Sequence, residues 1–172
     1  MSYGLLLLRL AVGGIMAAHG AQKLFGWWGG PGMAGTTAMC TKLGYRRPFL
    51  MGAALAASEL GGGVGLAVGF LTPLAALAVT VVMLTAVYLV HWPRGFFNTS
   101  GGWEFNLLIV ATAIAIVATG PGRLSVDRAL GWEKDITGVW WAGGVAAAAV
   151  FVSLLVLTVG RNRPAAPEAE PA

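Results

Sequence analysis

Charged residues are scarce in this sequence. Only 10% of its 172 residues are Asp, Glu, Lys or Arg, whereas 57% are hydrophobic, and the mean hydropathy is +0.75. An ordinary soluble domain is excluded, because such domains carry about a quarter charged residues. Several stretches of about 18 or more residues hold almost no charge, which is typical of transmembrane helices. The sequence therefore predicts an all-α, polytopic membrane helix bundle.

Cysteine is scarce too, and Cys40 is the one example. A single cysteine excludes an internal disulfide and a Cys-x-x-Cys redox pair, so we expect Cys40 to be a small apolar packing residue. Basic clusters with interleaved aromatic residues are also missing, which excludes nucleic acid as a partner. The net charge of +4 is instead expected to reflect the orientation signal of a protein whose partner is the lipid bilayer.

Five apolar stretches are predicted to cross the membrane, and all seven tryptophans fall near their ends, as in an aromatic belt. The stretches cover residues 3–21, 48–70, 73–90, 103–119 and 138–159. The connector 22–47 is predicted to hold a short surface helix, with Met33, Thr37, Cys40 and Leu43 near one face. Residues 161–172 are rich in Pro, Ala and Glu and are predicted to be a disordered tail.

Lysine and arginine are unevenly shared between the two ends of this predicted bundle. Seven lie at one end, namely Lys23, Lys42, Arg46, Arg47, Arg94, Arg161 and Arg163. Three lie at the other end, namely Arg123, Arg128 and Lys134. The positive-inside rule then places the end with seven in the cytoplasm, with the N-terminus outside and the C-terminus inside.

Two charged residues fall well inside predicted spans rather than at their ends, Arg9 in the first and Glu59 in the second. A charge at the centre of a membrane helix costs about 2.5–3.5 kcal/mol on insertion scales, so such residues usually pair or serve a function. The sequence predicts an intramembrane ion pair between Arg9 and Glu59. The alternative reading is that Glu59 handles a proton or anchors a ligand.

Alternating spans are expected to bring several polar residues to one membrane face. His19 and Lys23 end the first span on one helical face, because they are four residues apart. His91 ends the third span, Glu104 and Asn106 begin the fourth, and Glu59 lies deeper. The candidate polar pocket is therefore His19, Lys23, Glu59, His91, Glu104 and Asn106. The competing interpretation is that these residues have no shared function. Glu104 would then stabilise the N-terminus of its helix through the helix dipole, and Lys23 and His91 would extend to the membrane–water interface.

Other chemistries find little support among these residues. Paired metal-ligand patterns such as His-x-x-x-His or Glu-x-x-His do not occur, so no metal site is predicted. Gly61 to Gly65 follow no predicted strand and therefore do not form a dinucleotide-binding loop. The glycines and alanines of the second and fifth spans instead predict close helix packing.

Four sequence stretches together resemble the DoxX family of small bacterial membrane proteins. They are RLAVGGIMAAHGAQKLFG, SELGGGVGLAVGFLTPLAAL, HWPRGFFNTSGGWEFNLLI and GPGRLSVDRALG, within about residues 9–131. The family pattern has four spans. The resemblance thus implies a four-helix membrane domain at 1–131, and residues 132–160 are expected to form an additional C-terminal transmembrane helix. The residues that the resemblance matches to the family's pattern are Arg9, His19, Gly20, Lys23, Glu59, Gly95, Phe96, Phe97, Gly102, Glu104 and Asp127.

The resemblance implies a multi-pass protein of the bacterial inner membrane that is associated with redox, sulfur or oxidative-stress systems. Our first hypothesis is a membrane subunit of an oxidoreductase complex that binds quinone in the polar pocket, without a covalent cofactor, and works with a soluble redox partner. The second is a non-enzymatic scaffold or assembly factor that docks partners through Lys42, Arg46 and Arg47. The third is a small transporter or lipid-handling protein. Self-association into a homo-oligomer also stays open.

Overall fold

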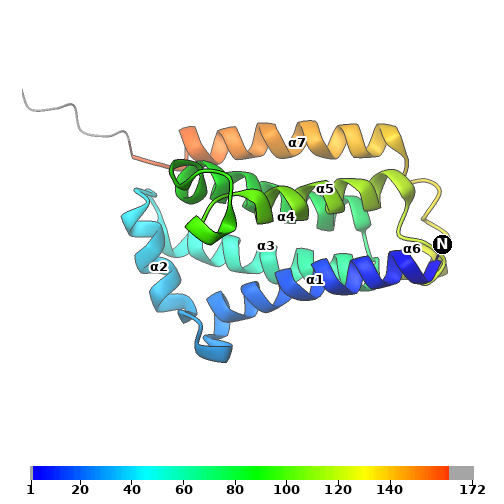
Figure 1. The fold of residues 1–172 in the computed structure, drawn as a ribbon, viewed down its shortest axis with the longest axis horizontal. Helices are drawn as coiled ribbons and strands as arrows, with labels where there is room; N and C mark the ends of the chain where they lie inside the picture. The colour runs from blue at the N-terminus through cyan, green and yellow to red at the C-terminus, as the bar shows by residue number, and fades with distance from the viewer. Residues whose placement is uncertain (1, 163–172) are drawn as a thin grey trace, which may run out of the picture.

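Five long helices lie side by side and form the bundle in Figure 1. The computed structural model describes residues 2–162. The long helices are α1 (Ser2–Phe25), α3 (Pro48–Val68), α4 (Thr72–Ala86), α5 (Glu104–Thr119) and α7 (Val139–Thr158). They match the five predicted spans to within a few residues, and no strand occurs within the described part. The all-α membrane bundle is therefore confirmed.

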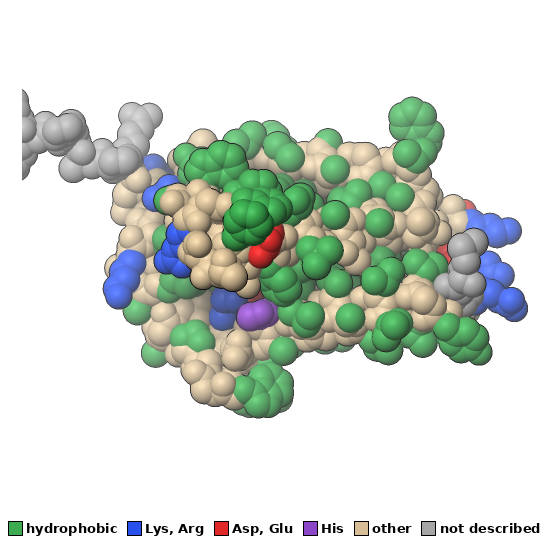
Figure 2. Space-filling view, viewed as in Figure 1, with side chains coloured by type: hydrophobic (Ala, Val, Ile, Leu, Met, Phe, Trp, Pro, Cys, Tyr) green, Lys and Arg blue, Asp and Glu red, His purple; other side chains and the backbone are tan. Residues whose placement is uncertain are grey.

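Length sets α5 apart from the other four long helices, although it is just as apolar. Within the described residues, four helices are long and apolar enough to cross a membrane, at Tyr3–Phe25, Pro48–Val68, Thr72–Arg94 and Val139–Thr158. Helix α5 has 16 residues and therefore spans about 24 Å, slightly less than a bilayer core. Apolar side chains cover the sides of the bundle while Lys and Arg gather at its ends (Figure 2). The chain is a multi-pass membrane protein.

Short elements close the two ends. At the end that we call the pocket end lie η1 (Trp27–Gly29), α2 (Gly32–Lys42), η3 (Trp92–Arg94), η4 (Asn98–Ser100) and residues 159–162. The opposite end, the turn end, holds residues 69–71 and the connector 120–138 with α6 (Val126–Ala129). The predicted surface helix in the first connector is thus α2, although its buried residues are Thr36 and Cys40.

Helices α1 and α3 touch backbone to backbone. A Cβ atom built on Gly63 would lie 2.6 Å from the carbonyl oxygen of Gly13 and 2.9 Å from Cα of Ala17. Gly20 in turn lies directly against Leu60. Only residues without a side chain allow this approach, which agrees with the predicted small-residue packing. The contact fixes the register of α1 against α3 and so decides which polar residues meet.

That register contradicts the predicted ion pair between Arg9 and Glu59. Arg9 is fully buried at the turn end, where its side chain lies against Gly69 and donates a hydrogen bond to the carbonyl of Leu124. Glu59 is ten residues from Gly69 along α3, which is about 15 Å. The prediction failed because positions within the two helices do not reveal how far one slides along the other.

Asp127 organises the turn end. Its buried carboxylate accepts hydrogen bonds from the backbone N–H of Leu71 (2.8 Å) and Thr72 (3.0 Å) and from the Thr72 hydroxyl (2.6 Å). These bonds stabilise the start of α4, where Leu71 has a positive φ of 45° that is unfavourable for a residue with a branched side chain. Asp127 also lies close enough to Arg9 to interact electrostatically.

Helix α7 packs along α4 and α5 at one side of the bundle. It buries Ala142, Val145, Ala149 and Ser153, which recur at the spacing expected for one helical face. Arg161 and Asn162, the first two residues of the predicted tail, bind the connector between α2 and α3. Arg161 Nε donates to the Leu43 carbonyl (2.8 Å) and Asn162 N–H to the Gly44 carbonyl (2.9 Å). The remaining predicted tail, 163–172, lies outside the described residues.

Candidate polar pocket between the ends of the helices

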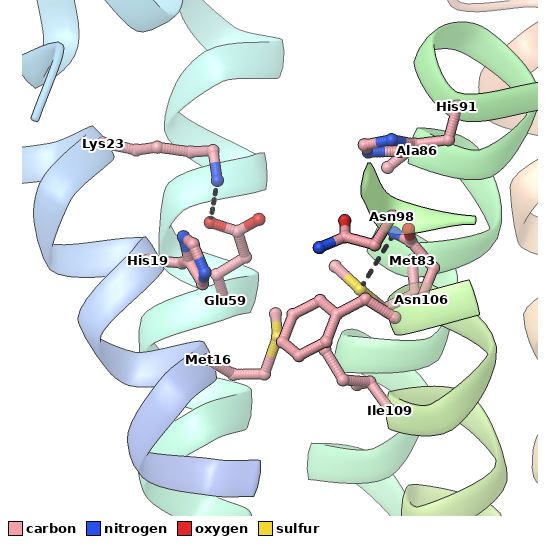
Figure 3. A pocket seen from close by; sticks show the side chains of 11 residues that line it. Met16, His19, Lys23, Glu59, Met83, Ala86, His91, Asn98, Asn106 and Ile109 are labelled. Carbon is pink, nitrogen blue, oxygen red and sulfur yellow. Dashed lines mark hydrogen bonds and ion pairs between the residues drawn. The ribbon is translucent and has the colours of Figure 1, made fainter. Parts of the chain in front are cut away.

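A cavity of about 390 Å³ lies near the pocket end of the bundle. Helices α1 and α3 supply one wall with His19, Lys23 and Glu59, and the segments that follow α4 supply the opposite wall with His91 and Asn98 (Figure 3). The volume lies in the range of small-molecule sites. The cavity is also lined by apolar side chains at its deeper end, namely Met16, Met83, Phe105 and Ile109.

An ion pair between Lys23 and Glu59 is the central polar feature of this wall. Lys23 Nζ lies 2.5 Å from Glu59 Oε2, and the side chains are 20% and 4% exposed. The pair replaces the predicted Arg9–Glu59 pair, because the glycine contact between α1 and α3 sets Lys23 level with Glu59. His19 is one turn before Lys23 on α1 and lies beside Glu59 in Figure 3. A buried carboxylate with a cation on one side can still accept a hydrogen bond on its other oxygen.

His91 reaches the cavity through a change in helix type. Residues Val87–His91 form a π-helical turn at the end of α4, and such turns are frequent at functional sites. The His91 Nδ1 lies 2.7 Å from the Gly101 carbonyl oxygen, which can only accept a hydrogen bond. Nδ1 therefore carries the hydrogen, and in the neutral ring Nε2 is left as a free acceptor. Sequence periodicity gives no sign of this extra residue in the turn.

Two asparagines complete the polar lining. Asn106 is 5% exposed, and its Nδ2 donates weakly to the sulfur of Met83 at 3.4 Å. Asn98 belongs to the loop before α5 and was not predicted as a site residue. No local motif marks it, because its position depends on how the loop folds back over the cavity.

Glu104 is the one predicted pocket residue that does not line the cavity. Its carboxylate accepts a hydrogen bond from the backbone N–H of Asn98 at 2.7 Å. Glu104 therefore holds the loop that places Asn98 at the cavity. The structure thus brings together His19, Lys23, Glu59, His91 and Asn106, and it adds Asn98.

A second cavity of about 200 Å³ begins behind the ion pair. Lys23, Glu59, Ala86 and His91 line both cavities, so the polar side chains of Lys23, Glu59 and His91 lie at their shared boundary. The other walls of the second cavity are largely apolar and come from α2, α3 and α4, with Leu43, Met51, Leu55, Val82 and Leu89 among them. Thr85 also lines it, and its buried hydroxyl has no hydrogen-bond partner within the described residues.

Cys40 lies on the wall of the second cavity and is 1% exposed. Burial raises the pKa of its thiol, because the thiolate would be desolvated there. This is consistent with the expected packing role rather than with a reactive thiolate. Among the described residues, no three His, Cys, Asp or Glu side chains cluster in a way that could hold a metal ion.

Comparison with known proteins places this chain in a family. The sequence profile of DoxX matches residues 4–92, which include α1, α3 and α4 and all but two of the predicted pocket residues. The chain belongs to the DoxX family. A Bacillus subtilis (strain 168) protein named "Putative oxidoreductase CatD" is 32% identical over 124 residues, which are 72% of this chain and 84% of that protein.

A second relative, an uncharacterised protein of Haemophilus influenzae, is 32% identical over 59 residues, which are 34% of this chain and 39% of that protein. No solved structure matches this chain. The family and the apolar helices agree that this DoxX protein is a multi-pass membrane protein.

Proposed function

We propose that this protein is a membrane subunit of a redox system and binds the head group of a quinone in the cavity of about 390 Å³. The observation that carries the proposal is the boundary formed by Lys23, Glu59 and His91. On one side lies a cavity with polar donors and acceptors, and on the other lies an apolar cavity. A quinone has the same division, because its carbonyl-bearing ring is attached to an apolar chain.

The polar groups suit both oxidation states of a quinone. Lys23, Asn98 and Asn106 are donors that can bind a quinone carbonyl, whereas Glu59 and His91 Nε2 can accept the hydroxyl hydrogens of a quinol. Reduction of the quinone adds two electrons and two protons. The protons would pass through Glu59 and His91, and the electrons would come from a soluble redox partner. The name of the Bacillus subtilis relative supports a redox role.

Access from the membrane is compatible with this ligand. The polar cavity opens on the face seen in Figure 2, where a histidine and a basic side chain lie at the bottom of a hollow among apolar side chains. A ligand that is dissolved in the bilayer could therefore enter from the side. Part of its apolar chain would extend past the ion pair toward Leu55, Val82 and Thr85.

The proposal also includes a location. The pocket end carries Lys42, Arg46, Arg47, Arg94 and Arg161, whereas the turn end carries Arg123, Arg128 and Lys134. By the positive-inside rule, the pocket end faces the cytoplasm of a bacterial inner membrane and the N-terminus lies outside. A cytoplasmic redox partner would then approach the end of the bundle that holds the cavity.

Quinone content of the purified protein tests the proposal. Protein extracted gently from native membranes should contain nearly one quinone per chain. Glu59→Gln should lower this content several-fold, because it removes the charge that positions Lys23. The matched control is Glu133→Gln, which makes the same change at a partly exposed carboxylate at the turn end that binds Arg128.

Equal quinone content in the Glu59→Gln and Glu133→Gln proteins would contradict the site. A background level in the wild-type protein would contradict quinone binding altogether. In that case the scaffold hypothesis predicts that soluble partners are still recovered with the membrane protein.

A further inference from the structure

In addition to the two cavities, a groove lies at the pocket end on the outside of the bundle, away from the Lys23–Glu59 pair. It has a volume of about 500 Å³ and is lined by Arg46, Arg47, Leu50, Met51, Ala54, Val159 and Gly160. None of these residues except Met51 lines either cavity described above. The groove therefore forms a separate site, and a ligand in it need not contact the polar cavity.

The groove exists because α3 and α7 are joined at one point. Arg46 N–H donates to the Gly160 carbonyl (3.0 Å), and Arg46 Nε donates to the Arg161 carbonyl (3.0 Å). Elsewhere α7 packs on α4 and α5 rather than on α3. The two helices are therefore tied together at the membrane surface and leave an apolar gap just below the tie.

Charge is concentrated at the mouth of this gap. Arg46 and Arg47 are exposed, and neither guanidinium forms an ion pair within the described residues. The acidic residues that the structure describes lie elsewhere, in α3, at the start of α5 or at the turn end. Two neighbouring guanidinium groups without counter-ions make a strong site for a phosphate group.

The other walls of the groove are apolar and face outward. Leu50 is 55% exposed and Val159 is 61% exposed, and Ala54 is one helical turn beyond Leu50 on the same side of α3. In a membrane protein, such outward-facing side chains meet lipid chains. A free phosphate ion or an acidic protein segment would leave this apolar wall uncovered, whereas a phospholipid matches both parts.

We propose that this groove binds one anionic phospholipid. Its phosphate contacts Arg46 and Arg47, and one acyl chain lies along Leu50, Ala54 and Val159. Basic pockets between transmembrane helices are suited to such head groups. The site combines α3 of the matched family region with α7, which lies beyond residue 92. The lipid therefore joins the C-terminal helix to the helix that carries Glu59.

Lipid titration followed by native mass spectrometry tests this site. The full-length protein is stripped of lipid in a neutral detergent and titrated with phosphatidylglycerol or with phosphatidylcholine of the same acyl chains. We expect one phosphatidylglycerol to bind before any phosphatidylcholine does. Arg46→Gln with Arg47→Gln should weaken this first binding step roughly 30-fold, as expected for the loss of two interfacial arginines.

Two further variants separate the site from a general charge effect. Arg123→Gln with Lys134→Gln removes the same charge from exposed positions at the turn end and should leave the first binding step unchanged. Ala54→Phe keeps both arginines but fills the apolar part of the groove, so it should weaken binding as well. Glycerol phosphate, which has the charge but no acyl chain, should not compete.

Several results would overturn the proposal. They are equal affinity for the two lipids, equal loss in the two double variants, and full binding by Ala54→Phe. Competition by glycerol phosphate would show an anion site that is not built for lipid and would also overturn it. None of these readouts depends on quinone content.

Discussion

The backbone contact between α1 and α3 makes Gly63→Ala the sharpest test of the packing. The added Cβ would meet the Gly13 carbonyl oxygen at 2.6 Å and the Ala17 Cα at 2.9 Å. Both atoms belong to the α1 backbone, so no side chain can rotate away. Since carbon atoms pack best at about 3.5–4.0 Å, α1 and α3 must separate by roughly 1 Å at this point.

The size of the stability loss caused by Gly63→Ala follows from a comparison with Gly61→Ala on the same helix. A Cβ at Gly61 would meet nothing within 4 Å. Both substitutions gain the helix propensity of alanine, about 1 kcal/mol, so this gain cancels between them. The remaining difference is the overpacking at Gly63, which is typically about 1–3 kcal/mol. We therefore expect Gly63→Ala to be less stable than Gly61→Ala by that amount.

Unfolding in mixed micelles with increasing sodium dodecyl sulfate, followed by circular dichroism, measures this difference. Gly63→Ala should also lower the affinity for any ligand that contacts both α1 and α3, because separation of the helices lengthens the Lys23–Glu59 contact. Identical unfolding curves for the two variants would refute the argument that the helix backbones are in contact.

Three other predictions use different parts of the molecule. Asp127→Ala should lower the free energy of unfolding by about 3–5 kcal/mol in the same titration, because it removes three hydrogen bonds and leaves Arg9 buried without a nearby negative charge. Alkylation of Cys40 by iodoacetamide should begin at a higher pH in the folded protein than in the unfolded protein, since burial raises the pKa of the thiol; a common pH profile would contradict its burial. A reporter fused to the C-terminus that is active only in the cytoplasm should be active, and an inactive reporter would reverse the proposed orientation.

Hydropathy was enough to predict the five helices, because lipid-facing and buried residues are both apolar and the signal does not depend on neighbours. The parity of the spans was also enough to bring His19, Lys23, His91 and Asn106 to one end. These predictions needed only the order of the helices along the chain.

Contacts that depend on register were not predictable in the same way. Arg9 and Lys23 lie on the same helix, and only the glycine contact decides that Lys23 rather than Arg9 meets Glu59. Glu104 was predicted to line the cavity, but Asn98 lines it instead and Glu104 binds the backbone of Asn98, because the loop before α5 folds over the cavity. Hydropathy carries no information about such a loop.

The position of Arg9 has a consequence for how the chain is made. Its hydrogen-bond partner Leu124 follows 115 residues later in the sequence. At a synthesis rate of about 5–20 residues per second, Arg9 waits roughly 6–23 s for that carbonyl to leave the ribosome. During this interval its charge is best accommodated at the membrane surface, so α1 is expected to sit shallow at first. Synthesis of the connector 120–138 would then draw α1 to its final depth.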